Sequence, residues 1–274
     1  MVVHLRVHAD GVARRMSAQP SIETDGLIRR AVLDMDPYVP VTSLEHLSDE
    51  LDIPIEALVK LDANENPYGT PSFVRDAIAK YPHLHIYPDP SQVRMRQALS
   101  RYVGVDADYL IGGAGGDELI DFVARLVVEP GDRVIDCVPT FAMYAFFTQL
   151  CGGNVVQVAR TESFDVDVGD VRRAVDGRTK AIFLASPNNP TANVVPREDV
   201  LALLDLDVLV VVDEAYFEFS GKTVADLVPS NPRLVVLRTF SKWAGLAGMR
   251  AGYAVCHPDV GRHLWKMKPP YNVC

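Results

Sequence analysis

The feature that most constrains the fold is an alternation of short apolar runs with helical patterns, which begins near Arg133. Six short runs are candidates for strands. They are Arg133–Val138, Val155–Val158, Lys180–Ala185, Val208–Val212, Leu234–Leu237 and Gly252–Val255. Apolar strands that are separated by helices are typical of a mostly parallel sheet buried on both faces. We therefore predict an α/β fold in which a mostly parallel sheet is sandwiched by helices.

Four segments between or before these runs have the apolar spacing of helices. They are Ser91–Tyr102, Asp117–Val127, Phe141–Leu150 and Arg197–Leu204. In open α/β sheets, ligands bind at the carboxyl ends of the strands. Residues that directly follow the apolar runs are therefore the first candidates for function, although the fold alone assigns none.

The first 60 residues read differently, because prolines punctuate short polar segments there. We expect residues 1–35 to be an N-terminal leader, either disordered or an over-long start with Met16 or Met35 nearer the true beginning. We expect residues 36–60 to form an N-terminal arm and part of a small domain, and residues 61–274 to form one large domain.

Composition argues against several classes of partner. The formal net charge of −9 disfavours nucleic acid and anionic membranes, because both repel an acidic surface. No apolar run approaches the roughly 18 residues that cross a bilayer, and the N-terminus lacks the apolar core of a signal peptide. The four cysteines show no CxxC pairing, so we expect reduced thiols and a cytoplasmic location. His83 and His85 lack partners at ligand-like spacing, and we predict no metal site.

A lysine follows the run Leu234–Leu237 among small hydroxyl residues, in the order Thr239, Phe240, Ser241, Lys242. An amine held at a strand exit can attack a carbonyl, and the neighbouring hydroxyls can bind phosphate. Eight residues further on, the guanidinium of Arg250 can clamp a phosphate with two hydrogen bonds. A solvated lysine on a loop is the usual alternative, and the motifs elsewhere in the chain argue against it.

Asp213 directly follows the run Val208–Val212. An aspartate at the tip of a buried strand is costly unless it meets a cation. The protonated ring nitrogen of a cofactor is such a cation. Tyr216, three residues later, could donate its phenol proton to a cofactor oxygen. The alternative is that Asp213 caps the next helix, with Tyr216 packed beneath it.

Two further loops carry weaker signals. Ser186–Thr191 follows a predicted strand, and its asparagines could bond either the turn backbone or a ligand. Gly112–Glu118 precedes a helical pattern, and its glycines let the backbone approach a phosphate. Its spacing matches neither the dinucleotide fingerprint nor a nucleotide P-loop. Alone, the Ser186–Thr191 segment is by default a plain turn, and the Gly112–Glu118 segment is equally well a flexible loop or an anion site.

Taken in order, these segments resemble the fold-type I pyridoxal-5′-phosphate aminotransferases. Four strings make the chain similar, more narrowly, to the histidinol-phosphate aminotransferase family: Leu61–Pro67, Tyr87–Asp89, Pro139–Tyr144 and Lys268–Val273. The resemblance implies amino transfer from L-histidinol phosphate to 2-oxoglutarate, giving imidazole-acetol phosphate and L-glutamate, within histidine biosynthesis. Aromatic amino acid aminotransferases and threonine-phosphate decarboxylases share the core motifs and stay open as alternatives.

The resemblance also implies roles around the cofactor ring. Lys242 would hold the cofactor as a Schiff base and later shuttle a proton. Asp213 would pair with the ring nitrogen, while Tyr216 and Asn189 would hydrogen-bond the ring hydroxyl. Phe141 would stack on the ring face. In this group Lys242, Asp213 and Tyr216 are the predicted catalytic residues.

The phosphate of the cofactor would be bound by side chains and by backbone amides. The side chains are those of Thr239, Ser241 and Arg250, and the amides are those of Gly115, Gly116 and Asp117. Tyr87 resembles a tyrosine that reaches the phosphate in the partner subunit, which implies a homodimer with shared sites.

Three departures from the family pattern matter. Gly116 stands where many relatives carry a serine, and Ala192 replaces the usual glycine. If position 192 needs a positive φ, the alanine costs about 1 kcal/mol. Family members continue past Val273 into a segment that builds most of the small domain and supplies an arginine for the substrate carboxylate. For a chain that ends at Cys274, the resemblance implies a cofactor site, an incomplete small domain and an incomplete substrate pocket; an inactive cofactor-binding fragment is the alternative.

Overall fold

The computed structural model describes residues 24–274, and the chain divides into two compact units, Met1–Ala63 and Asn64–Cys274. Much of the predicted leader, including the alternative start at Met16, therefore lies outside the described residues. The described part of the first unit holds helices α2 (Arg30–Leu33) and α3 (Leu44–Leu51). The Ser43 hydroxyl accepts a hydrogen bond from the His46 amide at 3.2 Å, which caps the first turn of α3.

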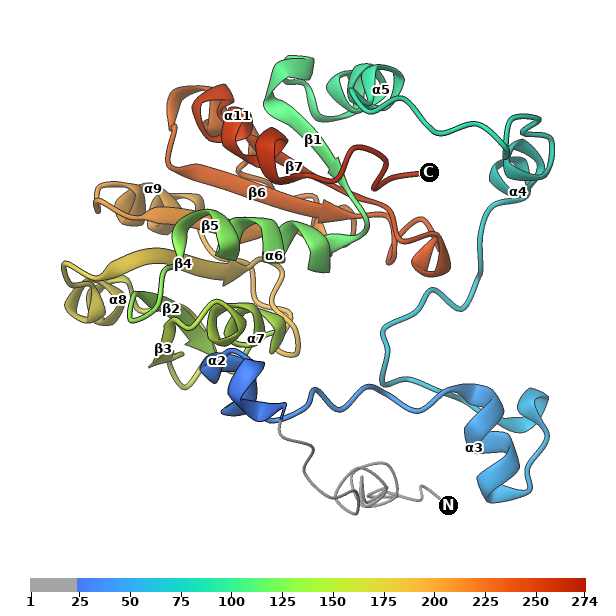
Figure 1. Ribbon diagram of the computed structural model, residues 1–274, viewed down its shortest axis with the longest axis horizontal. Coiled ribbons are helices and arrows are strands. Elements are labelled where there is room, and N and C mark those ends of the chain that lie inside the picture. The colour runs from blue at the N-terminus through green and yellow to red at the C-terminus, as the bar shows by residue number, and fades with distance from the viewer. Residues whose placement is uncertain (1–23) are drawn as a thin grey trace. The chain divides into compact units, whose positions relative to one another are not determined.

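The second unit is built on a seven-stranded sheet with the strand order β1-β7-β6-β5-β4-β2-β3 (Figure 1). Its strands are β1 (Leu110–Gly113), β2 (Arg133–Val138), β3 (Asn154–Ala159), β4 (Thr179–Ala185), β5 (Leu209–Asp213), β6 (Leu234–Thr239) and β7 (Gly252–Cys256). Strands β2 to β6 pair in parallel, whereas β7 runs antiparallel to both β6 and β1. The predicted mostly parallel sheet is confirmed.

Helices cover both faces of this sheet, as predicted. In chain order, the α-helices of the second unit are α4 (Ser72–Ala79), α5 (Val93–Val103), α6 (Gly116–Val127), α7 (Met143–Leu150), α8 (Val168–Ala174), α9 (Arg197–Leu204), α10 (Phe217–Ser220) and α11 (Pro258–Met267). Helices α6, α7 and α11 lie over one face, in front of the sheet in Figure 1, and share one apolar core with it. Helices α5, α8 and α9 share a second core with the other face. No helix within residues 24–274 is long and apolar enough to cross a membrane.

The two cores fix which way the side chains at the strand ends point. Along β5, Leu209 and Val211 belong to the core under α6 and α7, and Val210 and Val212 belong to the opposite core. Because successive side chains in a strand alternate between faces, Asp213 continues the row toward α7. The same alternation applies to β6, which ends at Thr239.

The strand that went unpredicted is β1. Its sequence, Leu110-Ile111-Gly112-Gly113, holds only two apolar side chains and runs into a glycine loop, so it has no strand signal of its own. It forms a strand because it pairs along its whole length with β7, from Leu110 opposite Val255 to Gly113 opposite Gly252. Tertiary pairing decided this element.

Candidate active site

Three loops that carry predicted site residues leave neighbouring parallel strands. Strands β4, β5 and β6 pair side by side and in parallel, so their carboxyl ends lie at one edge of the sheet. A cavity of about 600 Å³ opens at this edge, a volume suited to a small cofactor. Asn189, Tyr216 and Lys242 all line it. The structure therefore brings together one predicted residue from each loop.

Lys242 is half-buried in this cavity, with its Nζ 5.8 Å from the centre of the Tyr216 ring. Burial lowers the pKa of Lys242, because a less hydrated site disfavours the ammonium form. The carboxylates of Glu65, Asp117 and Asp213 oppose this effect. A lowered pKa leaves more of the amine unprotonated near neutral pH, which is the form that attacks a carbonyl.

Asp213 is buried at the end of β5 and faces α7. Its Oδ2 accepts a hydrogen bond from the Tyr144 hydroxyl at 2.7 Å, and its Oδ1 accepts one from the Ala215 amide at 3.0 Å. Burial raises the pKa of Asp213 to about 6. The residue that caps α10 is Tyr216, not Asp213, so the helix-cap alternative is wrong. A buried carboxylate with a raised pKa is a site prepared for a cation.

Tyr144 is a site residue that the sequence reasoning missed. Its ring is buried and stacks on Phe183 with centroids 5.0 Å apart, and the edge of Phe141 meets it at 5.7 Å. Phe141 lies just before α7, and Tyr144 lies in the first turn of that helix. Both belong to the string Pro139–Tyr144, which was the available signal. Through Tyr144, Phe141 lies near Asp213, and its stacking on a cofactor stays a prediction.

Tyr216 has a partner that was also not predicted. Its hydroxyl oxygen accepts a hydrogen bond from Asn64 Nδ2 at 3.0 Å, and burial raises the pKa of Tyr216. The phenol therefore keeps its proton at neutral pH and can donate it to an acceptor in the cavity. Asn64 lies within the string Leu61–Pro67, which carried the family resemblance without an assigned role.

The predicted phosphate-binding side chains meet at the ends of β6 and β1. Thr239 Oγ1 donates to Ser241 Oγ at 2.9 Å, and Arg250 Nη1 donates to the same Ser241 oxygen at 3.4 Å. Arg250 Nη2 also lies 3.1 Å from Asp117 Oδ2, in the first turn of α6. Hydroxyls, a guanidinium and a helix N-terminus that converge in this way can hold a phosphate.

Gly115 is the backbone element of this cradle. Its φ of 87° and ψ of 179° are accessible to glycine alone, and a Cβ there would lie 2.6 Å from Arg250 Nη2. The neighbouring Gly116 is different, because a Cβ at that position would meet nothing within 4 Å. The space at position 116 is therefore open for a small side chain such as serine.

The loop after β4 divides its two asparagines between structure and site. Asn188 is buried and donates to Pro139 O at 3.0 Å and Thr191 Oγ1 at 2.8 Å, so it holds the loop together. Asn189 lines the cavity. Ala192 in the same loop has a φ of 62°, so the condition for strain at this position is met.

Tyr87 lines a different cavity from the one that Asn189, Tyr216 and Lys242 line. Its ring is 76% exposed and stacks on Tyr271, with centroids 4.5 Å apart. It lines a separate apolar groove of about 660 Å³ together with residues of α4 and Met249. Its expected place in the site of a partner subunit stays a prediction.

Comparison with known proteins agrees with this geometry. The family model for class I and II aminotransferases matches residues 56–274. The chain is 54% identical over 255 residues to a histidinol-phosphate aminotransferase from Roseiflexus castenholzii, covering 90% of this chain and 68% of that protein. It is 49% identical over 216 residues to one from Dehalococcoides mccartyi, covering 79% of this chain and 60% of that protein.

A solved structure is also similar. The crystal structure of histidinol-phosphate aminotransferase from Sinorhizobium meliloti in complex with pyridoxal-5′-phosphate matches with a TM-score of 0.80 and 27% identity. The match covers 90% of this chain and 67% of that one. The chain thus spans 60 to 68% of the length of the relatives named here.

Proposed function

The chain belongs to the histidinol-phosphate aminotransferase family of the class I and II aminotransferases, and on that basis we propose its reaction and substrates. The proposed reaction transfers the amino group of L-histidinol phosphate to 2-oxoglutarate and yields imidazole-acetol phosphate and L-glutamate, in histidine biosynthesis. The observation that carries the proposal is the lysine of lowered pKa in a cavity at the ends of β4, β5 and β6.

The residues present fit pyridoxal 5′-phosphate at each of its functional groups. Asp213 offers a buried carboxylate for the ring nitrogen, and Arg250, Ser241 and Thr239 offer a cradle for the phosphate. The open approach at Gly115 leaves the backbone amides of α6 available to the same phosphate. Lys242 would hold the aldehyde carbon covalently.

When bound, the cofactor supplies an electron sink that acidifies the Cα–H of the amino substrate. Asp213 would keep that sink effective by holding a negative charge at the ring nitrogen. Tyr216 and Asn189 would orient the ring by hydrogen bonds to its hydroxyl. The Lys242 amine would take the proton from Cα as a general base, hold it on Nζ and return it as a general acid.

The test is a titration with pyridoxal 5′-phosphate, followed by turnover of histidinol phosphate, phenylalanine and threonine phosphate. We expect the absorbance of a lysine-bound cofactor in the wild-type protein, its loss in Lys242→Ala, and the fastest turnover with histidinol phosphate. A better rate with phenylalanine or threonine phosphate would favour one of the two alternative enzymes. A coloured protein without turnover would mean that this chain is a cofactor-binding fragment.

We also propose a homodimer. The groove around Tyr87 exposes many apolar side chains, and contiguous apolar surface of this kind is typical of an interface. Sedimentation of the wild-type protein and of Tyr87→Ala at several concentrations tests this, and a concentration-independent monomer would contradict it.

A cytoplasmic location completes the proposal, since the four cysteines are free thiols. In domain terms, residues 61–274 would be the cofactor-binding domain and residues 36–60 an arm and part of the small domain.

A further inference from the structure

Directly behind the cofactor site lies an ion pair between Glu214 and Arg238. Among the ion pairs of residues 24–274 it is unusual because both side chains are buried, with 1% and 3% of their surface exposed. Glu214 immediately follows Asp213, and Arg238 immediately precedes Thr239. None of the roles assigned above uses this pair.

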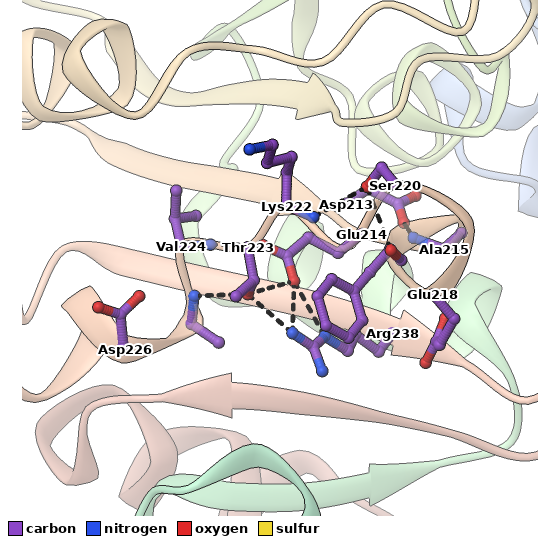
Figure 2. Close-up of polar contacts among 12 residues, drawn as sticks. Asp213, Glu214, Ala215, Glu218, Ser220, Lys222, Thr223, Val224, Asp226 and Arg238 are labelled. Atoms are coloured by element: carbon purple, nitrogen blue, oxygen red, sulfur yellow. Dashed lines mark hydrogen bonds and ion pairs between the residues drawn. The ribbon is translucent and has the colours of Figure 1, made fainter.

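Every charged oxygen of Glu214 has a partner (Figure 2). Glu214 Oε2 accepts from Arg238 Nε at 2.9 Å and from the Thr223 hydroxyl at 2.8 Å, and Oε1 accepts from the Val224 amide at 2.7 Å. Arg238 Nη2 donates to the same Thr223 hydroxyl at 2.7 Å. The arginine Cζ lies 3.7 Å from the centre of the Phe217 ring, at the start of α10.

This network lies on the opposite face of the sheet from the cofactor-binding groups. Asp213 and Thr239 continue the rows of side chains toward α6 and α7, so Glu214 and Arg238, one position removed, point the other way. The two strands are also joined here by a backbone hydrogen bond from the Glu214 amide to Leu237 O at 2.8 Å. The ion pair therefore ties the exit of β5 to the exit of β6 from behind.

We propose that Glu214 and Arg238 are positioning residues, which hold Asp213 and Tyr216 at a set distance from Thr239 and Lys242. The inference rests on the proposed cofactor site. The ring nitrogen, the aldehyde carbon and the phosphate are parts of one rigid molecule, so their protein partners must be correctly spaced before the cofactor arrives. Those partners come from two separate loops, and the ion pair is a direct side-chain link between the two strand exits.

Stability alone does not account for the pair. Removing two charges from water costs about as much as their attraction returns, and apolar residues of similar volume often replace a buried ion pair without loss of stability. What apolar side chains do not reproduce is directional hydrogen bonding that fixes one strand exit against the other. A positioning role therefore predicts that stability and cofactor binding respond differently to an apolar replacement.

The experiment compares the wild-type chain with the double variant Glu214→Leu/Arg238→Met. The matched control is Arg197→Met/Asp226→Leu, which removes an exposed ion pair joined by hydrogen bonds of 2.7 and 2.8 Å and made by neither the proposed cofactor-binding residues nor the buried pair. For each protein we would measure Tm, the Kd for pyridoxal 5′-phosphate, and the pH midpoint of the absorbance of lysine-bound cofactor. We expect the double variant to keep a cooperative unfolding transition, to bind pyridoxal 5′-phosphate at least tenfold more weakly and to show a displaced pH midpoint. The control should keep the wild-type Kd and the wild-type pH midpoint.

A second variant covers the case in which the double variant does not fold. Arg238→Lys keeps the charge but loses the Nε hydrogen bond to Glu214 and the Nη2 hydrogen bond to Thr223, and we expect a folded protein with a severalfold weaker Kd and a displaced midpoint. Unchanged Kd and midpoint in whichever of these variants folds would overturn the positioning role. If the wild-type protein itself bound no cofactor, the proposed function would fail and this inference with it. Normal wild-type binding with unaffected variants would overturn this inference alone.

Discussion

Substituting Gly115 by alanine tests the phosphate cradle most directly. The added Cβ would lie 2.6 Å from Arg250 Nη2 and 3.0 Å from its Cζ, closer than non-bonded atoms pack. The atoms it meets are the far end of a flexible side chain, so the guanidinium can swing aside at little steric cost. Swinging aside, however, removes Arg250 from the place where it would hold the phosphate.

Two magnitudes follow from this geometry. The backbone at Gly115, with φ 87° and ψ 179°, costs a side-chain-bearing residue about 1–3 kcal/mol, which the folded protein loses in stability. Loss of a charge-assisted contact to the phosphate costs binding a further 1.5–3 kcal/mol, on the order of a 10- to 100-fold rise in the Kd for the cofactor. Both effects should be visible at neutral pH.

The control is the next glycine along the chain. A Cβ at Gly116 meets nothing within 4 Å, so Gly116→Ala should leave Tm and Kd close to their wild-type values, and Gly116→Ser should tighten binding by adding a hydroxyl. Absorbance titration with pyridoxal 5′-phosphate measures Kd, and thermal unfolding without cofactor measures stability. If Gly115→Ala bound the cofactor as well as Gly116→Ala does, Arg250 would not be the phosphate ligand and the cradle would be wrong.

Three further predictions concern the same site. Ala192→Gly should raise the free energy of unfolding by about 0.5–1 kcal/mol, because Ala192 has a φ of 62°. The control Ala202→Gly, within α9, should lower the free energy of unfolding. An unchanged Tm for Ala192→Gly would show that the loop is unstrained. Asp213 has its pKa raised to about 6 in the folded chain, so the cofactor-free protein should lose stability as pH rises from about 4 to about 6, by on the order of 3 kcal/mol. Asp213→Asn should remove that loss while weakening cofactor binding. Urea unfolding at pH 4 and pH 7.5 measures the difference in the free energy of unfolding between the variant and the wild-type protein. The same difference at both pH values would contradict this prediction. Tyr144→Phe deletes the 2.7 Å hydrogen bond that lowers the pKa of Asp213. The pH at which stability falls should therefore move upward, and the Kd for the cofactor should rise severalfold. An unchanged pH dependence of stability would mean that Tyr144 contributes only packing.

Local pattern was sufficient for much of the fold. The bounds of β2 and α9 agree with the predicted segments residue for residue. β4 begins one residue earlier than predicted, and β5 is shifted by one residue at both ends. These elements bury one or two continuous rows of apolar side chains, and such rows are visible in the sequence. Helices α4, α8 and α11 went unpredicted, as did β1, which has too few apolar side chains to announce a strand.

The residues that meet at this edge of the sheet were likewise predictable from the sequence, as motifs at strand exits. Lys242, Tyr216 and Asn189 were predicted and line one cavity, and Thr239, Ser241 and Arg250 were predicted and contact one another. These residues are recognisable because the chemistry restricts which side chains can do the work. The roles themselves await the measurements described above.

Only the tertiary structure decided the contacts behind those residues. Tyr144 bonds Asp213 across 69 positions, Asn64 bonds Tyr216 across 152, and Glu214 bonds Arg238 across 24. The Glu214–Arg238 contact depends on the pairing and register of β5 and β6, whereas Asn64 reaches Tyr216 from a loop that precedes α4. The apolar pattern is local and repeats with the period of its own element, so the sequence by itself determined the elements and the reactive residues. Which partner each buried polar group meets depends on how distant elements pack, and that was settled by the fold alone.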